Sequence, residues 1–252
     1  MVEMMNVNEL KDKQVSRVKT GIKGLDDLIQ GGFPKGSNIV LSGPPGSGKS
    51  IFGMAFLAEG CRNNEKNLYV TVEQAPMEII EQAYQFNWDF NQWINQGLLN
   101  IYHIDFKKPF EMGMFEELLK NIENNQYNRM VIDSINPLSF KPLPVYYVDH
   151  RPFMPERIVV SEITRANIIG LFDKTRSKGI TTVCISQKDY NDAANTVIDY
   201  IGDGLITLDS IEVGTELSRT LKVKKLRKTD IDGVTHIFKF SPDGISIAKR
   251  EI

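Results

Sequence analysis

One segment of the sequence has the residue types and spacing of a loop that binds phosphate groups. Residues 43–50 read Gly-Pro-Pro-Gly-Ser-Gly-Lys-Ser, a complete G-x-x-x-x-G-K-[ST] pattern. The glycines at 46 and 48 let the main chain wrap closely around an anion, and the N–H groups that follow point inward at the positive end of a helix. Lys49 is expected to reach the β- and γ-phosphates, and the Ser50 hydroxyl to bind Mg²⁺. The expected nucleotide-binding residues are Gly43, Pro44, Pro45, Gly46, Ser47, Gly48, Lys49, Ser50 and Ile51.

A metal-bound triphosphate also needs a carboxylate at the end of a neighbouring strand. Residues 129–133 form an apolar run that ends in Asp133. Asp133 is expected to hold Mg²⁺ through water, because this ion keeps much of its hydration shell. The alternative is that Asp133 caps the next helix.

The elements that must position these residues are short apolar runs that alternate with amphipathic segments. Continuous apolar runs are typical of strands covered on both faces, and strand–helix alternation favours a parallel sheet. Helices are expected after the loop, from Pro76, and over Glu156–Lys178, which is followed by Gly179. The expected strands are Asn38–Ser42, Leu68–Val72, Leu98–Ile104, Met130–Asp133, Ile180–Ser186 and Gly204–Leu208. The predicted fold class is α/β, with a mostly parallel sheet flanked by helices.

The end of the chain has a different pattern. Arg219–Leu226 alternates between apolar and polar residues, and Thr235–Phe240 and Ile245–Ala248 are joined by Ser241–Gly244, a good tight-turn sequence. This pattern predicts an antiparallel extension of the same sheet. We therefore expect a polar leader over residues 1–14 and one domain over residues 15–252.

Composition excludes several classes of protein. The 252 residues are 41% apolar and carry a net charge of −2, which does not support a strongly basic nucleic-acid binder. There is no apolar run long enough to span a membrane and no secretory signal, so we expect a cytoplasmic protein without membrane contact. Cys61 and Cys184 are expected in the core. The three histidines lack metal-ligand spacing.

The motifs taken together resemble a known family. Thr20–Leu28 and Gly31–Gly36, with the phosphate loop, Asp133 and Val223–Thr229, are similar to RecA-superfamily ATPases of the KaiC and RadA type. The resemblance covers roughly residues 15 to 250, and single-domain archaeal KaiC-like and RadA-paralogue proteins match the length best. It implies a RecA-like P-loop NTPase core that binds ATP and Mg²⁺ and hydrolyses ATP.

The resemblance also implies further catalytic residues. Glu73 follows the second strand, where the family carries the glutamate that activates water. KaiC-type proteins commonly have two adjacent glutamates, whereas this chain has Glu73 and Gln74. If Gln74 held the catalytic position, an amide could not accept the proton from water. We expect Glu73 to be the catalytic residue, and Gln187, at the end of a core strand, to contact the γ-phosphate.

Lys225 and Arg227 resemble the K-x-R that family members project into the nucleotide of the neighbouring subunit. Such a finger stabilises charge on the transferred phosphoryl group. It implies a homo-oligomer, with a hexameric ring as the family arrangement. The alternative is a basic strand face that is solvated.

The resemblance to RecA-like proteins implies two loops as candidates for binding single-stranded DNA. Residues 137–157 interleave cations with aromatic side chains, as a stacking platform requires. The loop nevertheless has a net charge of only +1, and residues 188–195 contain Asp189 and Asp192 against one lysine. The alternative is that the aromatics pack on a neighbouring subunit or a protein partner.

These observations predict an oligomeric, Mg²⁺-dependent ATPase of the RecA/KaiC-like type, acting in DNA recombination and repair or in signalling. One alternative is an ATP-gated binding module that does not hydrolyse ATP and regulates a partner. Another is an accessory protein that binds single-stranded DNA or a RadA-like recombinase. Autophosphorylation, as in KaiC, has less support.

Overall fold

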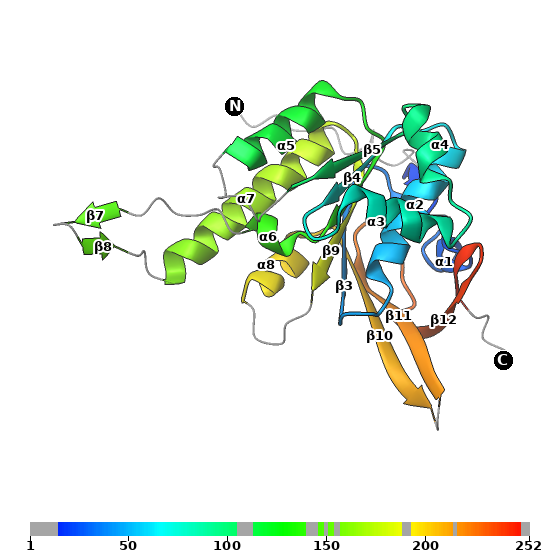
Figure 1. Cartoon of the computed structure of the whole chain (residues 1–252). Coiled ribbons are helices and arrows are strands. Elements are labelled where there is room, and N and C mark those ends of the chain that lie inside the picture. The colour runs from blue at the N-terminus through cyan, green and yellow to red at the C-terminus, as the bar shows by residue number, and fades with distance from the viewer. Residues whose placement is uncertain are drawn as a thin grey trace, which may run out of the picture.

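The computed structural model describes residues 15–104, 113–139, 146–148, 151–153, 157–187, 193–213 and 216–247. Within them, nine strands form one sheet in the order β13-β12-β11-β10-β3-β9-β6-β4-β5. Helices cover both faces of this sheet (Figure 1). The predicted α/β class with a mostly parallel sheet is confirmed.

Six strands form the parallel part of the sheet, and each overlaps one of the predicted apolar runs, with ends that differ by at most one residue in five of the six. Because all six run in the same direction, their carboxyl ends meet at one edge. The six strands are β3 (Asn38–Gly43), β4 (Asn67–Thr71), β5 (Leu99–His103), β6 (Arg129–Asp133), β9 (Thr181–Gln187) and β10 (Gly204–Val213).

The antiparallel extension is also confirmed. β10 pairs with β11 (Glu216–Leu226), and β12 (Thr235–Ser241) and β13 (Gly244–Ile247) continue the sheet through a tight turn. β10 is longer than predicted, because its polar second half continues the ladder with β11 up to Val213. The β10–β11 hairpin projects beyond the rest of the sheet in Figure 1.

Two apolar layers lie on the two faces of the sheet. One contains buried side chains of α2 (Lys49–Arg62), and the other contains those of α7 (Arg157–Ser177). The strands supply both layers by alternation, as in β4, where Tyr69 faces α2 while Leu68 and Val70 face the other way. On the α2 face lie α1 (Leu25–Leu28), α3 (Pro76–Tyr84) and α4 (Phe90–Asn95), and on the α7 face lie α5 (Gly113–Asn124) and α8 (Ala193–Ile201).

Both cysteines are buried, one in each layer, as predicted. Burial raises the pKa of the Cys61 thiol to about 11 and raises the pKa of the Cys184 thiol further. Both side chains therefore act as small core residues.

The structure adds elements that the sequence patterns did not predict. β1 (Arg17–Val18) and β2 (Phe33–Pro34) form a small separate sheet. In and beside residues 137–157, which were expected to form a loop, α6 (Asn136–Ser139) overlaps the start, and β7 (Tyr146–Val148) pairs with β8 (Arg151–Phe153). The antiparallel pairing satisfies backbone groups that an irregular loop would leave to water.

Candidate functional site

The loop between β3 and α2 has the backbone of an anion-binding nest. Gly46 and Gly48 have φ angles of 76° and 98°, a region that favours glycine. A Cβ on Gly43 would lie 2.3 Å from the Leu208 carbonyl oxygen, and a Cβ on Gly48 would lie 2.6 Å from the ring of Phe240. The glycines therefore permit both the loop conformation and the close approach of β10 and β12.

Lys49 lies at the first turn of α2 and is buried. Its Nζ donates to the carbonyl oxygens of Gly43 and Pro44, at 2.8 and 2.7 Å. Burial lowers the pKa of Lys49, and the charges of Asp133 and Glu73 oppose that effect. The Lys49 ammonium is therefore hydrogen-bonded to its own loop and lies near the carboxylates of Asp133 and Glu73.

Asp133 ends β6 directly beside Thr71 of β4. The buried Tyr69 hydroxyl donates to Asp133 Oδ2 at 2.9 Å. Burial, and secondarily the charge of Asp133, raise the pKa of Tyr69 well above its usual value. The phenol therefore stays protonated and acts as the hydrogen-bond donor.

Glu73 is held by two donors at the ends of neighbouring strands. Ser134 Oγ donates to Glu73 Oε1 at 3.2 Å, and Gln187 Nε2 donates to the same oxygen at 2.7 Å. The Gln74 main chain is instead tied to Thr71: Gln74 N donates to Thr71 Oγ1, and the threonine hydroxyl donates to Gln74 O. The two neighbours therefore have different surroundings.

Lys49, Glu73, Asp133 and Gln187 line one cavity of about 420 Å³ at the carboxyl edge of the sheet. Glu73 lines it and Gln74 does not. Of the predicted site residues, the cavity brings together Pro45, Gly46, Gly48, Lys49, Ser50, Ile51, Glu73, Asp133 and Gln187. A lysine at a helix start opposite two carboxylates can hold a polyphosphate and a hydrated cation.

Comparison with known proteins agrees with this geometry. The family model of the KaiC ATPase matches residues 18–146 and 147–252. The chain belongs to the KaiC ATPase family.

Relatives within the KaiC family include short and long proteins. The UPF0273 protein of Aeropyrum pernix is 30% identical, and the match covers 92% of this chain and 94% of that protein. The circadian clock oscillator protein KaiC of Prochlorococcus marinus is 29% identical over 93% of this chain, which spans 46% of that longer protein.

The fold is also shared with a solved member of the group. The crystal structure of a KaiC-like protein from Pyrococcus horikoshii matches with a TM-score of 0.77 and 26% identity, covering 94% of this chain and 100% of that one. The RecA-like, KaiC-type core expected from the motifs is thus confirmed.

The cavity of this KaiC family member contains side chains that the motifs did not predict: Gln82, Ile185, Arg219 and Phe240. The Arg219 guanidinium lies over the Phe240 ring, 4.8 Å from its centre. Phe240 also meets Phe86, which stacks on Trp88. Arg219 and Phe240 follow the phosphate loop by about 170 residues or more along the chain. A single cation in an alternating strand gave no signal, because only strand pairing brings Arg219 to the loop.

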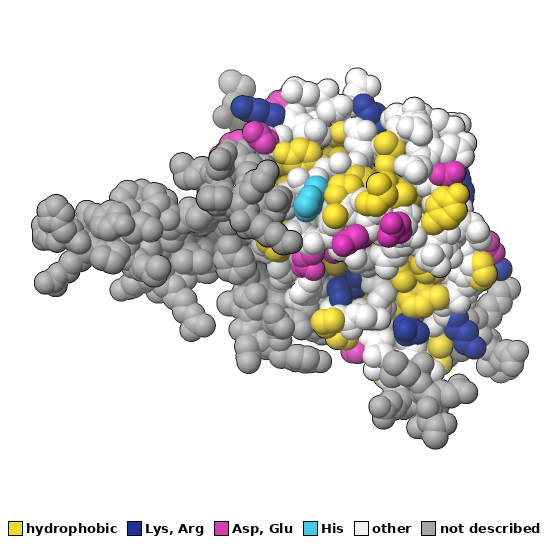
Figure 2. All heavy atoms as spheres, in the orientation of Figure 1, with side chains coloured by type: hydrophobic (Ala, Val, Ile, Leu, Met, Phe, Trp, Pro, Cys, Tyr) yellow, Lys and Arg dark blue, Asp and Glu magenta, His cyan; other side chains and the backbone are white. Residues whose placement is uncertain are grey.

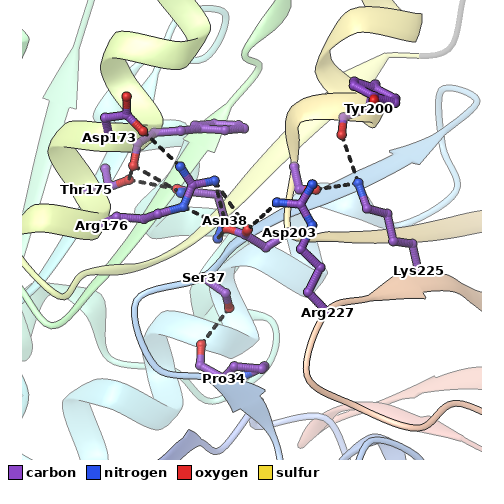
Figure 3. A network of polar contacts seen from close by, with 12 residues as sticks. Pro34, Ser37, Asn38, Asp173, Thr175, Arg176, Tyr200, Asp203, Lys225 and Arg227 are labelled. Carbon is purple, nitrogen blue, oxygen red and sulfur yellow. Dashed lines mark hydrogen bonds and ion pairs between the residues drawn. The ribbon is translucent and has the colours of Figure 1, made fainter. Parts of the chain in front are cut away.

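Lys225 and Arg227 lie at the opposite end of the sheet from the cavity. Leu226, between them, pairs with Gly204 at the start of β10, and Gly204 pairs with Ile39 at the start of β3. Arg227 Nη1 lies 3.2 Å from Asp203 Oδ1, and Arg176 from α7 binds the same carboxylate (Figure 3).

Lys225 Nζ donates to the carbonyl oxygens of Tyr200 and Gly202, at 2.9 and 2.6 Å (Figure 3). Burial and the Arg227 charge lower the pKa of Lys225, and nearby aspartates oppose them. These contacts place both cations beside the end of α8, about 17 Å from the phosphate loop by the rise of β3.

Figure 2 shows the face of the molecule that α3 crosses in Figure 1. Acidic and basic side chains lie close together near its middle, with apolar side chains around them. Met77 and Tyr84 on α3 are each 63% exposed.

Within the described residues, no helix has both the length and the apolar character that crossing a membrane requires.

The structure does not test the candidate DNA loops. Residues 140–145, 149–150, 154–156 and 188–192 lie outside the described residues, and so do the side chains of β7 and β8. DNA contact therefore stays a prediction from the sequence.

Proposed function

We propose that this KaiC family member binds ATP with Mg²⁺ in the cavity at the carboxyl edge of the sheet and hydrolyses it. The observation that carries the proposal is the meeting of three charged groups there. Lys49 at the start of α2, Asp133 at the end of β6 and Glu73 shortly after β4 line one cavity beside a glycine-rich loop. The KaiC family match supports ATP chemistry in general.

Two observations fit the phosphate groups of a nucleotide. Among the residues that the structure describes, the buried Ser47 hydroxyl in the loop finds no hydrogen-bond partner. Lys49 Nζ donates to loop carbonyls, which are weaker partners than phosphate oxygens. We infer that Lys49 exchanges these carbonyls for the β- and γ-phosphates.

The donor set also fits Mg²⁺. A serine hydroxyl and a carboxylate are the hard oxygen ligands that this ion takes alongside water and phosphate. Ser50 and Asp133 would hold it, and when bound it would neutralise charge on the phosphates. Both side chains line the cavity, and Ser50 follows Lys49 directly on α2.

Glu73 is the group that would orient and deprotonate the attacking water. Its carboxylate lines the cavity and keeps a second oxygen, Oε2, beside the Oε1 that accepts from Ser134 and Gln187. Gln187 would move from Glu73 to the γ-phosphate when ATP binds. An amide that exchanges between these partners reports the nucleotide state to the residues after β9.

The remaining wall of the cavity would bind the base. The base of a nucleotide can stack on an arginine guanidinium or on an aromatic ring. Arg219 and Phe240 supply both kinds of surface in the cavity. We assign them to the base and Lys49 to the phosphates.

Lys225 and Arg227 would act on the nucleotide of a neighbouring subunit in a homo-oligomer, for which the family arrangement is a hexamer. They lie at the far end of the sheet from their own cavity. The side chain of Arg227 is 54% exposed, so it can leave Asp203 for a phosphate. The contacts with Asp203 and α8 would hold the finger until that neighbour is present.

Calorimetry with ATP and Mg²⁺, together with phosphate release, tests the proposal. Wild-type protein is expected to bind ATP and release phosphate. Lys49→Ala is expected to lose binding, whereas Lys66→Ala, at the amino end of β4, is expected to keep it. A folded wild-type protein that takes up no ATP would refute the proposal.

A further inference from the structure

Within the part of the chain that the structure describes, the Tyr69 hydroxyl holds the Asp133 carboxylate. The Tyr69 side chain is 1% exposed, and its oxygen donates to Asp133 Oδ2 at 2.9 Å. This tyrosine lies outside the phosphate loop and does not line the cavity. The contact therefore reaches Asp133 from the protein core and not from the cavity.

Strand register explains how a core residue reaches the cavity edge. Thr71 of β4 lies beside Asp133, so Tyr69 lies two residues earlier and on the same face of the sheet. Its ring packs in the apolar layer under α2, beside Val131. The hydroxyl therefore extends along the face from a ring that packing holds in place.

The hydrogen bond from Tyr69 gives the two oxygens of the Asp133 carboxylate different partners. With Oδ2 accepting from Tyr69, Oδ1 remains for groups in the cavity. Without this bond the carboxylate can rotate about its last torsion, which has a broad energy profile. It is then free to turn toward the Lys49 ammonium, whose charge attracts it.

We propose that Tyr69 is a positioning residue that orients Asp133 for the hydrated Mg²⁺ of the nucleotide and keeps this carboxylate from pairing with Lys49. The inference rests on the proposed ATP site and adds a residue to it. Hydrogen bonds to metal-ligating groups fix their orientation, and losing one typically costs about ten- to a hundredfold in metal affinity or activity.

The test is the affinity for ATP in Tyr69→Phe, measured by calorimetry with Mg²⁺ and again with a chelator. The wild type is expected to bind ATP more tightly with Mg²⁺. In Tyr69→Phe this gain is expected to fall by about tenfold or more, while the affinity in chelator stays within about twofold of the wild type. Tyr69→Met, which also fills the buried volume without a hydroxyl, is expected to lose the same gain.

Tyr127→Phe is the matched control. The Tyr127 hydroxyl is also bonded, to Asn100 and Asn121, but it belongs to the apolar layer on the other face of the sheet. It is expected to keep the wild-type gain from Mg²⁺. Thermal unfolding without ligand identifies any variant that fails to fold.

Three outcomes would overturn the inference. They are an unchanged Mg²⁺ gain in folded Tyr69→Phe, an equal loss of affinity with and without Mg²⁺, and a further loss when Tyr69→Phe is added to Asp133→Ala, since a residue that acts through Asp133 has no effect without it. A wild-type protein that binds no ATP would instead refute the proposed function.

Discussion

Glu73 accepts two hydrogen bonds from neighbouring strand ends, and that placement distinguishes it from Gln74. Both side chains are polar and follow the same strand. Only Glu73 lines the cavity, where Ser134 and Gln187 hold it. In the proposed mechanism, Glu73 is therefore the residue of this adjacent pair that accepts the proton from water.

Glu73→Gln is expected to reduce phosphate release by about a hundredfold or more while leaving ATP affinity near the wild-type value. The reason is that an amide positions water but accepts no proton. Single-turnover phosphate release and ATP titration measure the two effects.

Gln74→Ala is the matched control and is expected to keep phosphate release within about threefold of the wild type, a factor worth well under 1 kcal/mol of barrier. Full activity in Glu73→Gln would contradict the assignment. A severe loss in Gln74→Ala would move the catalytic role to position 74.

At the scale of elements, the site is assembled from the carboxyl ends of parallel strands and one wall from the antiparallel extension. Ligands in open α/β sheets bind at this edge because loops and helix starts converge there. β11, which runs opposite to the six parallel strands, adds Arg219, and β12, which is antiparallel to β11, adds Phe240. The extension is therefore part of the site as well as part of the sheet.

Arg219→Ala is expected to weaken ATP binding by about tenfold, because a stacked cation contributes on the order of 1 kcal/mol or more. Binding of tripolyphosphate, which has no base, is expected to change by less than about twofold. Competition titrations with the two ligands separate the effects.

Lys224→Ala on the same strand is the control for Arg219, since Lys224 is exposed and lies outside the cavity. An equal loss of tripolyphosphate binding in Arg219→Ala would mean that Arg219 acts on the phosphates. That result would place the base elsewhere in the cavity.

Asp203 links three elements at the opposite edge of the sheet. It accepts from the Asn38 main chain in β3, from Arg176 in α7 and from Arg227 after β11. Its side chain is only 13% exposed, so replacement leaves these donors poorly paired. Such a link stabilises the sheet where β3 and β10 begin.

Asp203→Asn is expected to lower the free energy of unfolding by about 2 kcal/mol, because hydrogen bonds to charged groups contribute about 1.5–3 kcal/mol. Chemical denaturation measures this. Asp173→Asn, whose 65% exposed carboxylate also pairs with Arg176, is expected to lose less than about 1 kcal/mol. Equal losses in both variants would show that Asp203 is an ordinary surface partner.

For the whole molecule, the cavity and the K-x-R cations occupy opposite edges of one sheet. A single chain therefore cannot direct Lys225 and Arg227 at its own nucleotide without unfolding the strands between them. A head-to-tail arrangement of identical chains places one edge against the other, and closed rings follow when the rotation closes.

Mixing two inactive variants is expected to restore activity. Glu73→Gln protomers keep the finger and Arg227→Ala protomers keep the water-activating carboxylate, so sites formed between them are complete. Random mixing in equal amounts is expected to recover about a quarter of the wild-type rate. No recovery from co-assembled variants would show that Arg227 acts within its own chain, and an Arg227→Ala protein that is fully active by itself would show that Arg227 has no role.

The sequence by itself determined the phosphate-loop motif and the strands beside it, and it predicted Lys49, Ser50 and Asp133 as site residues. These features follow from local patterns: glycine spacing, apolar runs and the residue that ends each run. The tertiary structure decided that Glu73 rather than Gln74 lines the cavity, that Tyr69 holds Asp133, and that Arg219 and Phe240 complete the wall. Such contacts depend on strand order and register, which pair residues far apart in the chain and leave no local trace in the sequence.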